Sequence, residues 1–124
     1  MRNIGILFIV TAALFASFGM MWGIYMAISG EHMTAPAHAH LNLIGWVTMA
    51  LFGLYYAITP AAQGSLARIH YVLHTSAVLC FTPGIVLAVR QGGEALAAIG
   101  SFLVLGSMLV FLFTVLSASR RIAA

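Results

Sequence analysis

Four apolar stretches, each about as long as a membrane-spanning helix, take up most of the 124-residue chain. They cover approximately residues 4–28, 38–58, 69–89 and 95–116. A helix rises ~1.5 Å per residue, so about 20 apolar residues cross the hydrocarbon core of a bilayer. Each break between two stretches contains glycine, a residue typical of turns. We therefore predict an all-α integral membrane protein, with one domain of four transmembrane helices that form an antiparallel arc in the lipid bilayer.

The low charge of the chain excludes other classes of protein. Apolar residues make up 63% of the chain and charged residues only 6%, whereas soluble domains average about 45–50% and about 25%. A soluble fold of this size has too little interior to hide so much apolar surface. The net charge of +3 comes from scattered arginines, so it does not indicate nucleic acid as a partner. The single cysteine, Cys80, excludes a disulfide within the chain.

The arginines predict which way the helices cross the membrane. With four crossings, one side of the membrane holds Arg2, Arg68, Arg120 and Arg121, and the other holds Arg90 alone. Positive residues gather on the cytoplasmic side, so we expect a multi-pass protein of a bacterial-type inner (cell) membrane with both termini in the cytoplasm. The first apolar run is far longer than that of a signal peptide, so we expect it to remain as a helix.

Small residues recur at spacings of three and four along the first helix. They are Ala12, Ala16, Gly19, Gly23 and Ala27. Small residues in this pattern let membrane helices approach one another closely, although glycine and alanine are common in membrane helices in any case. The pattern favours a packing face on this helix.

Two of the five histidines, His38 and His40, stand where the second helix enters the membrane. Side chains two positions apart on a helix point ~200° from each other. If both residues are helical, the rings serve two pockets on opposite sides of the helix, and if the helix begins at His40, one shared site becomes possible. Neutral imidazole is a good ligand for iron, copper or zinc. The alternative is a pair of interfacial histidines bonded to headgroups, water or backbone.

A second pair, His70 and His74, opens the third helix from the other side of the membrane. Side chains four apart share a helix face, so these two can bind one copper or zinc ion. The alternative is solvation near the water interface beside Arg68 and Tyr71. The second helix rises ~28 Å between His40 and Thr59, so the two histidine pairs cannot share a metal ion within one chain.

A family resemblance lies around the first pair. Residues 37–47 read Ala-His-Ala-His-Leu-Asn-Leu-Ile-Gly-Trp-Val, and residues 51–56 read Leu-Phe-Gly-Leu-Tyr-Tyr. This segment resembles the second-helix segment of the haem-copper oxidase subunit I superfamily and of its short four-helix relatives. The local match covers about twenty residues, and the rest of the chain matches only in the number and order of its helices.

The resemblance implies an assembly and a cofactor. Subunit I of the large oxidases has twelve helices in three arcs of four, so a homotrimer of this chain would imitate it. The resemblance also implies b-type haem at each subunit interface, with His38 from one chain and His40 from its neighbour, or His40 and another ligand of one chain. Arg90 would hold a haem propionate, although the family has two arginines there, or it would anchor the helix end. Asn42 would orient a ligand ring or bond between helices.

The same resemblance argues against oxygen reduction. The family's copper site needs histidines near the outer end of the third helix, and this stretch has none. Glu- or Lys-lined proton channels are absent as well. We therefore expect a haem protein of electron transfer or sensing rather than an enzyme. The alternatives are a haem-free copper- or zinc-binding membrane protein and an accessory structural subunit.

Overall fold

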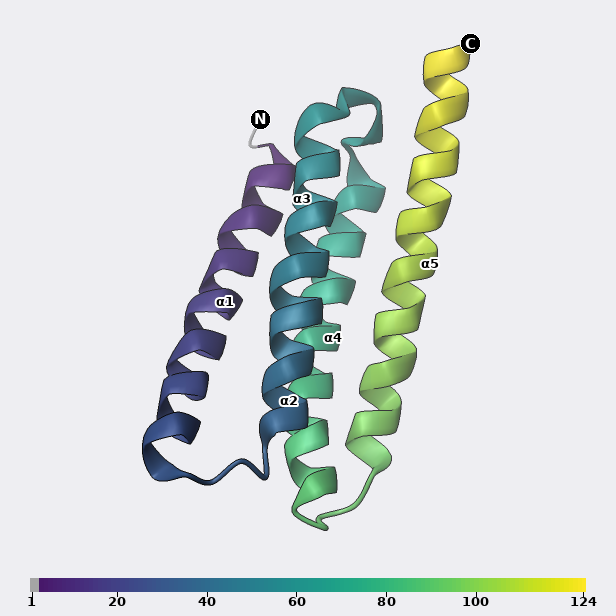
Figure 1. Cartoon of the computed structure of the whole chain (residues 1–124). Coiled ribbons are helices and arrows are strands. Elements are labelled where there is room, and N and C mark those ends of the chain that lie inside the picture. Colours follow the sequence, from purple (N-terminus) through teal and green to yellow (C-terminus); the bar gives the residue numbers. More distant parts are fainter. Residues whose placement is uncertain (1–2) are drawn as a thin grey trace.

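A computed structural model describes residues 3–124, so Met1 and Arg2 lie outside the described part. The helices are α1 (Ile4–Ser29), α2 (Ala35–His40), the π-helix η1 (Leu41–Thr48), α3 (Met49–Ile58), the 3-10 turn η2 (Pro60–Ala62), α4 (Ser65–Val89) and α5 (Ala95–Ala123). Since α2, η1 and α3 follow one another without a break, they form one rod, and residues 3–124 form four rods in all (Figure 1). The prediction of an all-α fold is confirmed.

The predicted helix limits differ from the observed ones mainly at the ends. The second rod begins at Ala35 rather than near His38, because Pro36 is accepted in the first turn of a helix. The helix α4 begins at Ser65, and α5 continues through Arg120 and Arg121 to Ala123. Hydropathy marks only the part of a helix that lies in hydrocarbon, so it does not detect polar turns at the helix ends.

The rods run antiparallel, and successive rods lie side by side (Figure 1). The helix α1 packs mainly on α3 and η1, and α5 packs mainly on α4. One end of the bundle holds Asn3 and the end of α5, and we call it the terminal end. The other end holds the connections at residues 30–34 and 90–94, and we call it the loop end. The predicted distribution holds for the described arginines, because Arg90 alone is at the loop end. Which end faces the cytoplasm stays a prediction.

Close helix contacts depend on glycine. A Cβ atom on Gly5 would lie 2.5 Å from the backbone of Gly53, and one on Gly100 would lie 2.5 Å from the Cα atom of Phe81. Such contacts join α1 to α3 and α5 to α4. The predicted packing face of α1 is confirmed at four of its members, because Ala12, Ala16 and Gly19 are buried and Gly23 touches His38; Ala27 is exposed near the helix end.

The outer surface of the bundle is apolar all round. Large side chains such as Leu14, Phe102 and Phe113 are 66%, 74% and 61% exposed. The four rods are 26, 24, 25 and 29 residues long, and each contains a window with mean hydropathy between 1.6 and 2.4. A water-soluble surface would not carry so much apolar area. The chain is therefore a multi-pass membrane protein whose outer face suits lipid.

Candidate functional site

The rings of His38 and His40 leave α2 in opposite directions. His38 points at α1, where a Cβ atom on Gly23 would lie 3.1 Å from its Cε1, and its ring meets Trp22 edge-on at 6.3 Å. His40 points at α4, where its ring meets Phe81 edge-on at 5.2 Å. The predicted divergence is confirmed, because both residues lie in regular helix. Within one chain these two rings cannot bind the same ion.

One ring nitrogen of His40 is fixed by a hydrogen bond, and the other is free. Its Nδ1 lies 2.7 Å from the carbonyl oxygen of Pro36, one turn earlier. A carbonyl only accepts hydrogen bonds, so Nδ1 carries the proton and donates it. Nε2 then keeps its lone pair, and it has no hydrogen-bond partner among residues 3–124. This tautomer is the one that histidine ligands of metals adopt when a backbone carbonyl orients them.

His38 is held differently. Its Nε2 lies 3.2 Å from the side-chain nitrogen of Asn42, one turn later, and the amide of Asn42 lies against Gly19 of α1. Since the amide nitrogen donates, the proton of the ring is on Nδ1. That Nδ1 is buried and has no hydrogen-bond partner in the described part of the chain. The predicted contact between Asn42 and a histidine ring is present, and His38 keeps one polar atom unsatisfied.

Arg90 ends α4 at the loop end, on the same side of the bundle as His38 and His40. Its guanidinium lies 3.7 Å from the carboxylate of Glu31 in the first loop, and both side chains are about half exposed. An exposed ion pair of this kind contributes little to stability. Arg90 thus lies at the end of the bundle where it was predicted. Its partner within the chain is the carboxylate of Glu31, and a carboxylate of a ligand could take the same place.

A π-helical segment, η1, begins directly after His40. The sequence predicts an unbroken α-helix here, so this is a correction. The wider turns of a π-helix disturb the regular backbone pairing, and backbone groups at membrane depth must find partners within the protein. The hydroxyl of Thr48 donates to the carbonyl of Leu43 at 2.8 Å, and Nε2 of His74 lies 3.0 Å from the carbonyl of Ile44.

The π segment determines which way the outer histidines face. In an α-helix each residue turns the chain by ~100°, so His40 would share a face with Leu51, Leu54 and Ile58. These three are 58%, 52% and 79% exposed and face outward. A π segment holds about one residue more than the α-helix it replaces, which turns the preceding part by ~100°. His40 then lies on the face of Phe52, toward α4, as observed.

The same turn applies to His38. In an unbroken helix it would share the face of Tyr56, because residues 18 positions apart are separated by about five full turns. Tyr56 faces the interior of the bundle, where its ring stacks on Phe8 of α1 and contacts His70 of α4 and Phe111 of α5. After the turn His38 lies on the face of Gly53, toward α1, as observed. The π segment therefore places one imidazole on each side of the second rod.

The inner pair, His70 and His74, is enclosed in the bundle. Their side chains are 0% and 1% exposed. The interpretation that they are solvated near the interface is wrong, because α4 begins one turn earlier than predicted and Tyr56 and Ser107 cover them. As their spacing predicts, the two rings share a face, with centroids 6.2 Å apart.

A continuous chain of hydrogen bonds joins these groups, and the last acceptor fixes its direction. His74 Nε2 can only donate to the carbonyl of Ile44 (3.0 Å), so its Nδ1 accepts from the hydroxyl of Ser107 (2.8 Å). The oxygen of Ser107 then accepts from Nε2 of His70 (3.0 Å). Nδ1 of His70 in turn accepts from the hydroxyl of Tyr56 (2.8 Å). We call this series, from Tyr56 to the Ile44 carbonyl, the buried relay.

The buried relay uses all four ring nitrogens of the inner pair. A metal ion bound by His70 and His74 would have to displace Ser107. Residues 3–124 also contain no group of three His, Cys, Asp or Glu side chains that could hold an ion. Sequence reasoning missed the partners Tyr56 and Ser107. The available signals were a serine near the middle of the apolar helix α5 and a tyrosine in the second rod.

No family model, no curated protein and no solved structure matches this chain. The resemblance of its second helix to oxidase subunit I therefore rests on the local residues alone.

Proposed function

We propose that the protein is a membrane haem b-binding protein for electron transfer or sensing, in which His40 provides an axial ligand through Nε2. One observation carries the proposal. The ring of His40 is oriented by the Pro36 carbonyl, and its unprotonated nitrogen has no partner. Because His40 lies near the loop end and this nitrogen is not buried, a ligand at the surface of the bundle can reach it.

Haem fits this site better than a bare metal ion does. A structural or catalytic zinc site needs three or four protein ligands, and the described residues offer no such group. The porphyrin already supplies four nitrogens to its iron, so one or two imidazoles complete the coordination. One axial ligand per chain, His40, is therefore enough for a haem whose second axial ligand comes from elsewhere.

The second ligand comes from another copy of the chain in this proposal. His38 and His40 diverge across α2, so a haem between neighbouring subunits would meet His40 of one and His38 of the next. Closed rings of identical contacts are the usual outcome of such heterologous interfaces, and the resemblance to a three-arc oxidase subunit favours a homotrimer. To reach the iron of a neighbour, His38 would have to turn away from Trp22 of its own α1 and give up its contact with Asn42. Its unpaired Nδ1 is consistent with a ring whose partners are incomplete.

The remaining residues of the loop end have supporting roles. Arg90 would bind a propionate with its guanidinium in place of Glu31, since a guanidinium suits a carboxylate. Asn42 and the Pro36 carbonyl would hold the ring planes. Bound haem would supply one-electron redox chemistry, and the apolar surroundings would tune its potential.

The test is a visible spectrum of the purified protein with added haemin, oxidised and then reduced with dithionite. We expect a Soret band and a sharp α-band that are lost in His40→Ala and retained in His32→Ala. His32 is the matched control, because it is exposed at the same end and its Nδ1 also lies near a carbonyl, that of Gly30. A colourless protein that contains copper or zinc would instead support the metal-binding alternative, and one without either would support the structural alternative.

The subunit arrangement has its own test. Native mass measurement should show a trimer, and a mixture of His38→Ala and His40→Ala chains should recover part of the haem band, because some interfaces then hold both native rings. A stable monomer that binds haem would contradict the intersubunit site and leave the single-chain variant.

A further inference from the structure

Arg68 carries a positive charge that no acidic side chain of the protein can balance. It is exposed in the first turn of α4, at the terminal end. The chain has only two acidic residues, Glu31 and Glu94. Both belong to the loop end, where Glu31 pairs with Arg90 and Glu94 precedes α5. No acidic side chain at the terminal end is therefore available to pair with Arg68.

Two apolar grooves meet at Arg68. The first has a volume of about 800 Å³, runs between α1 and α4, and is walled by residues that include Leu7, Val10 and Tyr71. The second, of about 520 Å³, is a shallow groove on the surface of α4 alone, which runs past Leu73. Arg68 and Val72 border both grooves. Arg68 therefore lies at the head of one groove between two helices and of one shallow apolar groove on α4.

The polar groups of the first groove are already paired, apart from Arg68. The hydroxyl of Tyr71 bonds to that of Thr11 at 2.8 Å. The side chain of Asn3 accepts from Gly5 and from Gln63 and lies 3.4 Å from the carbonyl of Ala57. The walls below Arg68 are thus suited to an apolar part of a ligand, such as an acyl chain. Among the described residues, the guanidinium is the one group of this groove that is free to bind an anion.

We infer that this corner binds one anionic diacyl phospholipid, with its phosphate on Arg68 and one acyl chain in each groove. From Arg68 to Ser76, the far end of the second groove, the helix rises ~12 Å. This length lies within the ~15 Å of one leaflet's hydrocarbon. Basic pockets between membrane helices bind acidic headgroups in this way.

A second copy of the chain does not meet the same requirement. Copies in one membrane share an orientation, so a neighbour presents its own terminal end at this level. That end has no acidic side chain either, because the only two lie at the loop end. A protein helix from a copy could fill a groove but would leave the guanidinium without an anion. A phospholipid satisfies both the charge and the apolar walls.

Native mass spectrometry of the full chain, titrated with phosphatidylglycerol or with phosphatidylcholine, tests the inference. We expect one tightly held phosphatidylglycerol per chain and weaker retention of phosphatidylcholine. Arg68→Gln should lower phosphatidylglycerol retention about fivefold, the ratio that corresponds to ~1 kcal/mol for one arginine at a membrane surface. Arg120→Gln is the matched control, since Arg120 is an exposed arginine of the same end, and it should retain the lipid.

A second variant tests the grooves without changing the charge. Val72 is 62% exposed, so Val72→Trp should fold, and its indole would obstruct both grooves and lower retention of the lipid. Equal retention of the two lipids by the native chain would overturn the inference. So would a loss of oligomers, rather than of lipid, in Arg68→Gln, because a protein partner would then occupy the grooves. Neither result depends on haem.

Discussion

The two histidine pairs of this protein consist of the same residue type in the same bundle, and they differ in how their nitrogens are used. Every ring nitrogen of His70 and His74 has a partner from the chain. In the outer pair, Nε2 of His40 and Nδ1 of His38 have no partner among the residues that the structure describes. The difference arises because the inner rings face polar groups on other helices, whereas the outer rings bond only within their own rod. The inner pair is therefore saturated by the chain, whereas the outer pair keeps the free nitrogens that the proposed haem site requires.

The two regions are also connected. His74 donates to the carbonyl of Ile44 within the π segment, and that segment turns the outer histidines toward their neighbours. The inner pair therefore stabilises the structure, and through η1 it supports the geometry of the outer pair.

Removal of one residue from the π segment should break this connection most completely. Deletion of Leu43, which is 59% exposed, would allow η1 to become α-helical and would turn His40 by ~100° toward lipid. In a His40→Cys, Phe81→Cys, Cys80→Ala background, oxidation should crosslink the full-length chain and not the deleted one.

Leu43→Ala in the same background is the control and should crosslink normally. Crosslinking of the deleted chain would show that the direction of position 40 does not depend on the extra residue.

Leucine substitutions should separate the two pairs by their effect on stability. His70→Leu leaves the hydroxyls of Tyr56 and Ser107 buried and without His70, so we expect it to lower the free energy of unfolding by about 2–4 kcal/mol. His40→Leu removes only a bond within its own helix and should cost under ~1 kcal/mol. Unfolding in detergent, followed by circular dichroism, measures both; equal losses would contradict the division into a structural and a binding pair.

Loss of the central hydroxyl of the buried relay should have a smaller effect. Ser107→Ala removes two interhelical hydrogen bonds, each worth ~0.6 kcal/mol in membranes, and leaves two ring nitrogens unpaired. We expect a loss of about 1–2 kcal/mol. Ser101→Ala is the matched control, because the hydroxyl of Ser101 is exposed and bonds to a carbonyl of its own helix. If the two serines behave alike, the relay does not join the helices energetically.

The smallest effect is expected at the loop end. Glu31→Gln breaks the exposed pair with Arg90 and should change stability by under ~0.5 kcal/mol. It should also leave Arg90 available, so haem binding should be unchanged or stronger. Weaker haem binding in this variant would contradict the role of Arg90 as a propionate partner, and the spectral titration used for His40 measures it.

Several features of the fold follow from the sequence because they are local. Apolar run length locates the four spans, and the ~100° turn per residue predicts that His38 and His40 diverge. The absolute direction of these rings did not follow from the sequence, because it depends on a π-helical segment that no residue pattern predicts. The burial of His70 and His74 did not follow from the sequence either. Tyr56 lies 14 positions from His70, and Ser107 lies 37 positions from His70 and 33 from His74. Spacing within one helix cannot show what another helix brings to it.

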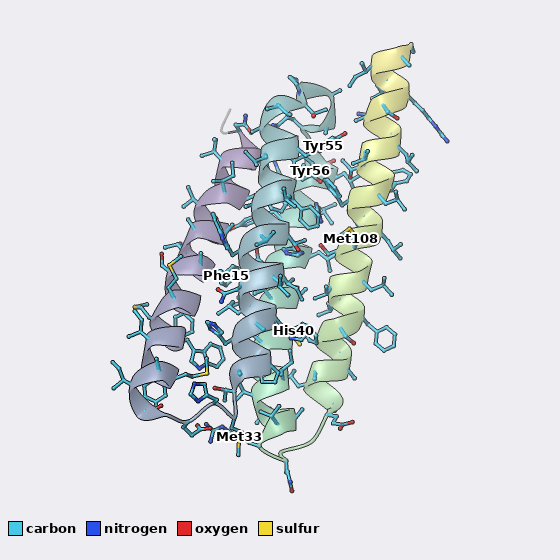
Figure 2. All side chains as sticks on the ribbon, viewed as in Figure 1. Phe15, Met33, His40, Tyr55, Tyr56 and Met108 are labelled. Atoms are coloured by element: carbon cyan, nitrogen blue, oxygen red, sulfur yellow. The ribbon has the colours of Figure 1, made fainter. Side chains whose placement is uncertain are left out.

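The buried relay has one further consequence, which concerns charge. Each hydrogen in it points from Tyr56 toward Ile44, that is, from the terminal end toward the loop end, and Figure 2 shows Tyr56 and His40 at these two levels. The bonds add up to a permanent dipole whose direction cannot reverse, because a carbonyl closes the series. Its positive pole faces the level of His40 through a medium that screens poorly. A negative charge placed at that level would therefore be stabilised by the hydrogens of the buried relay.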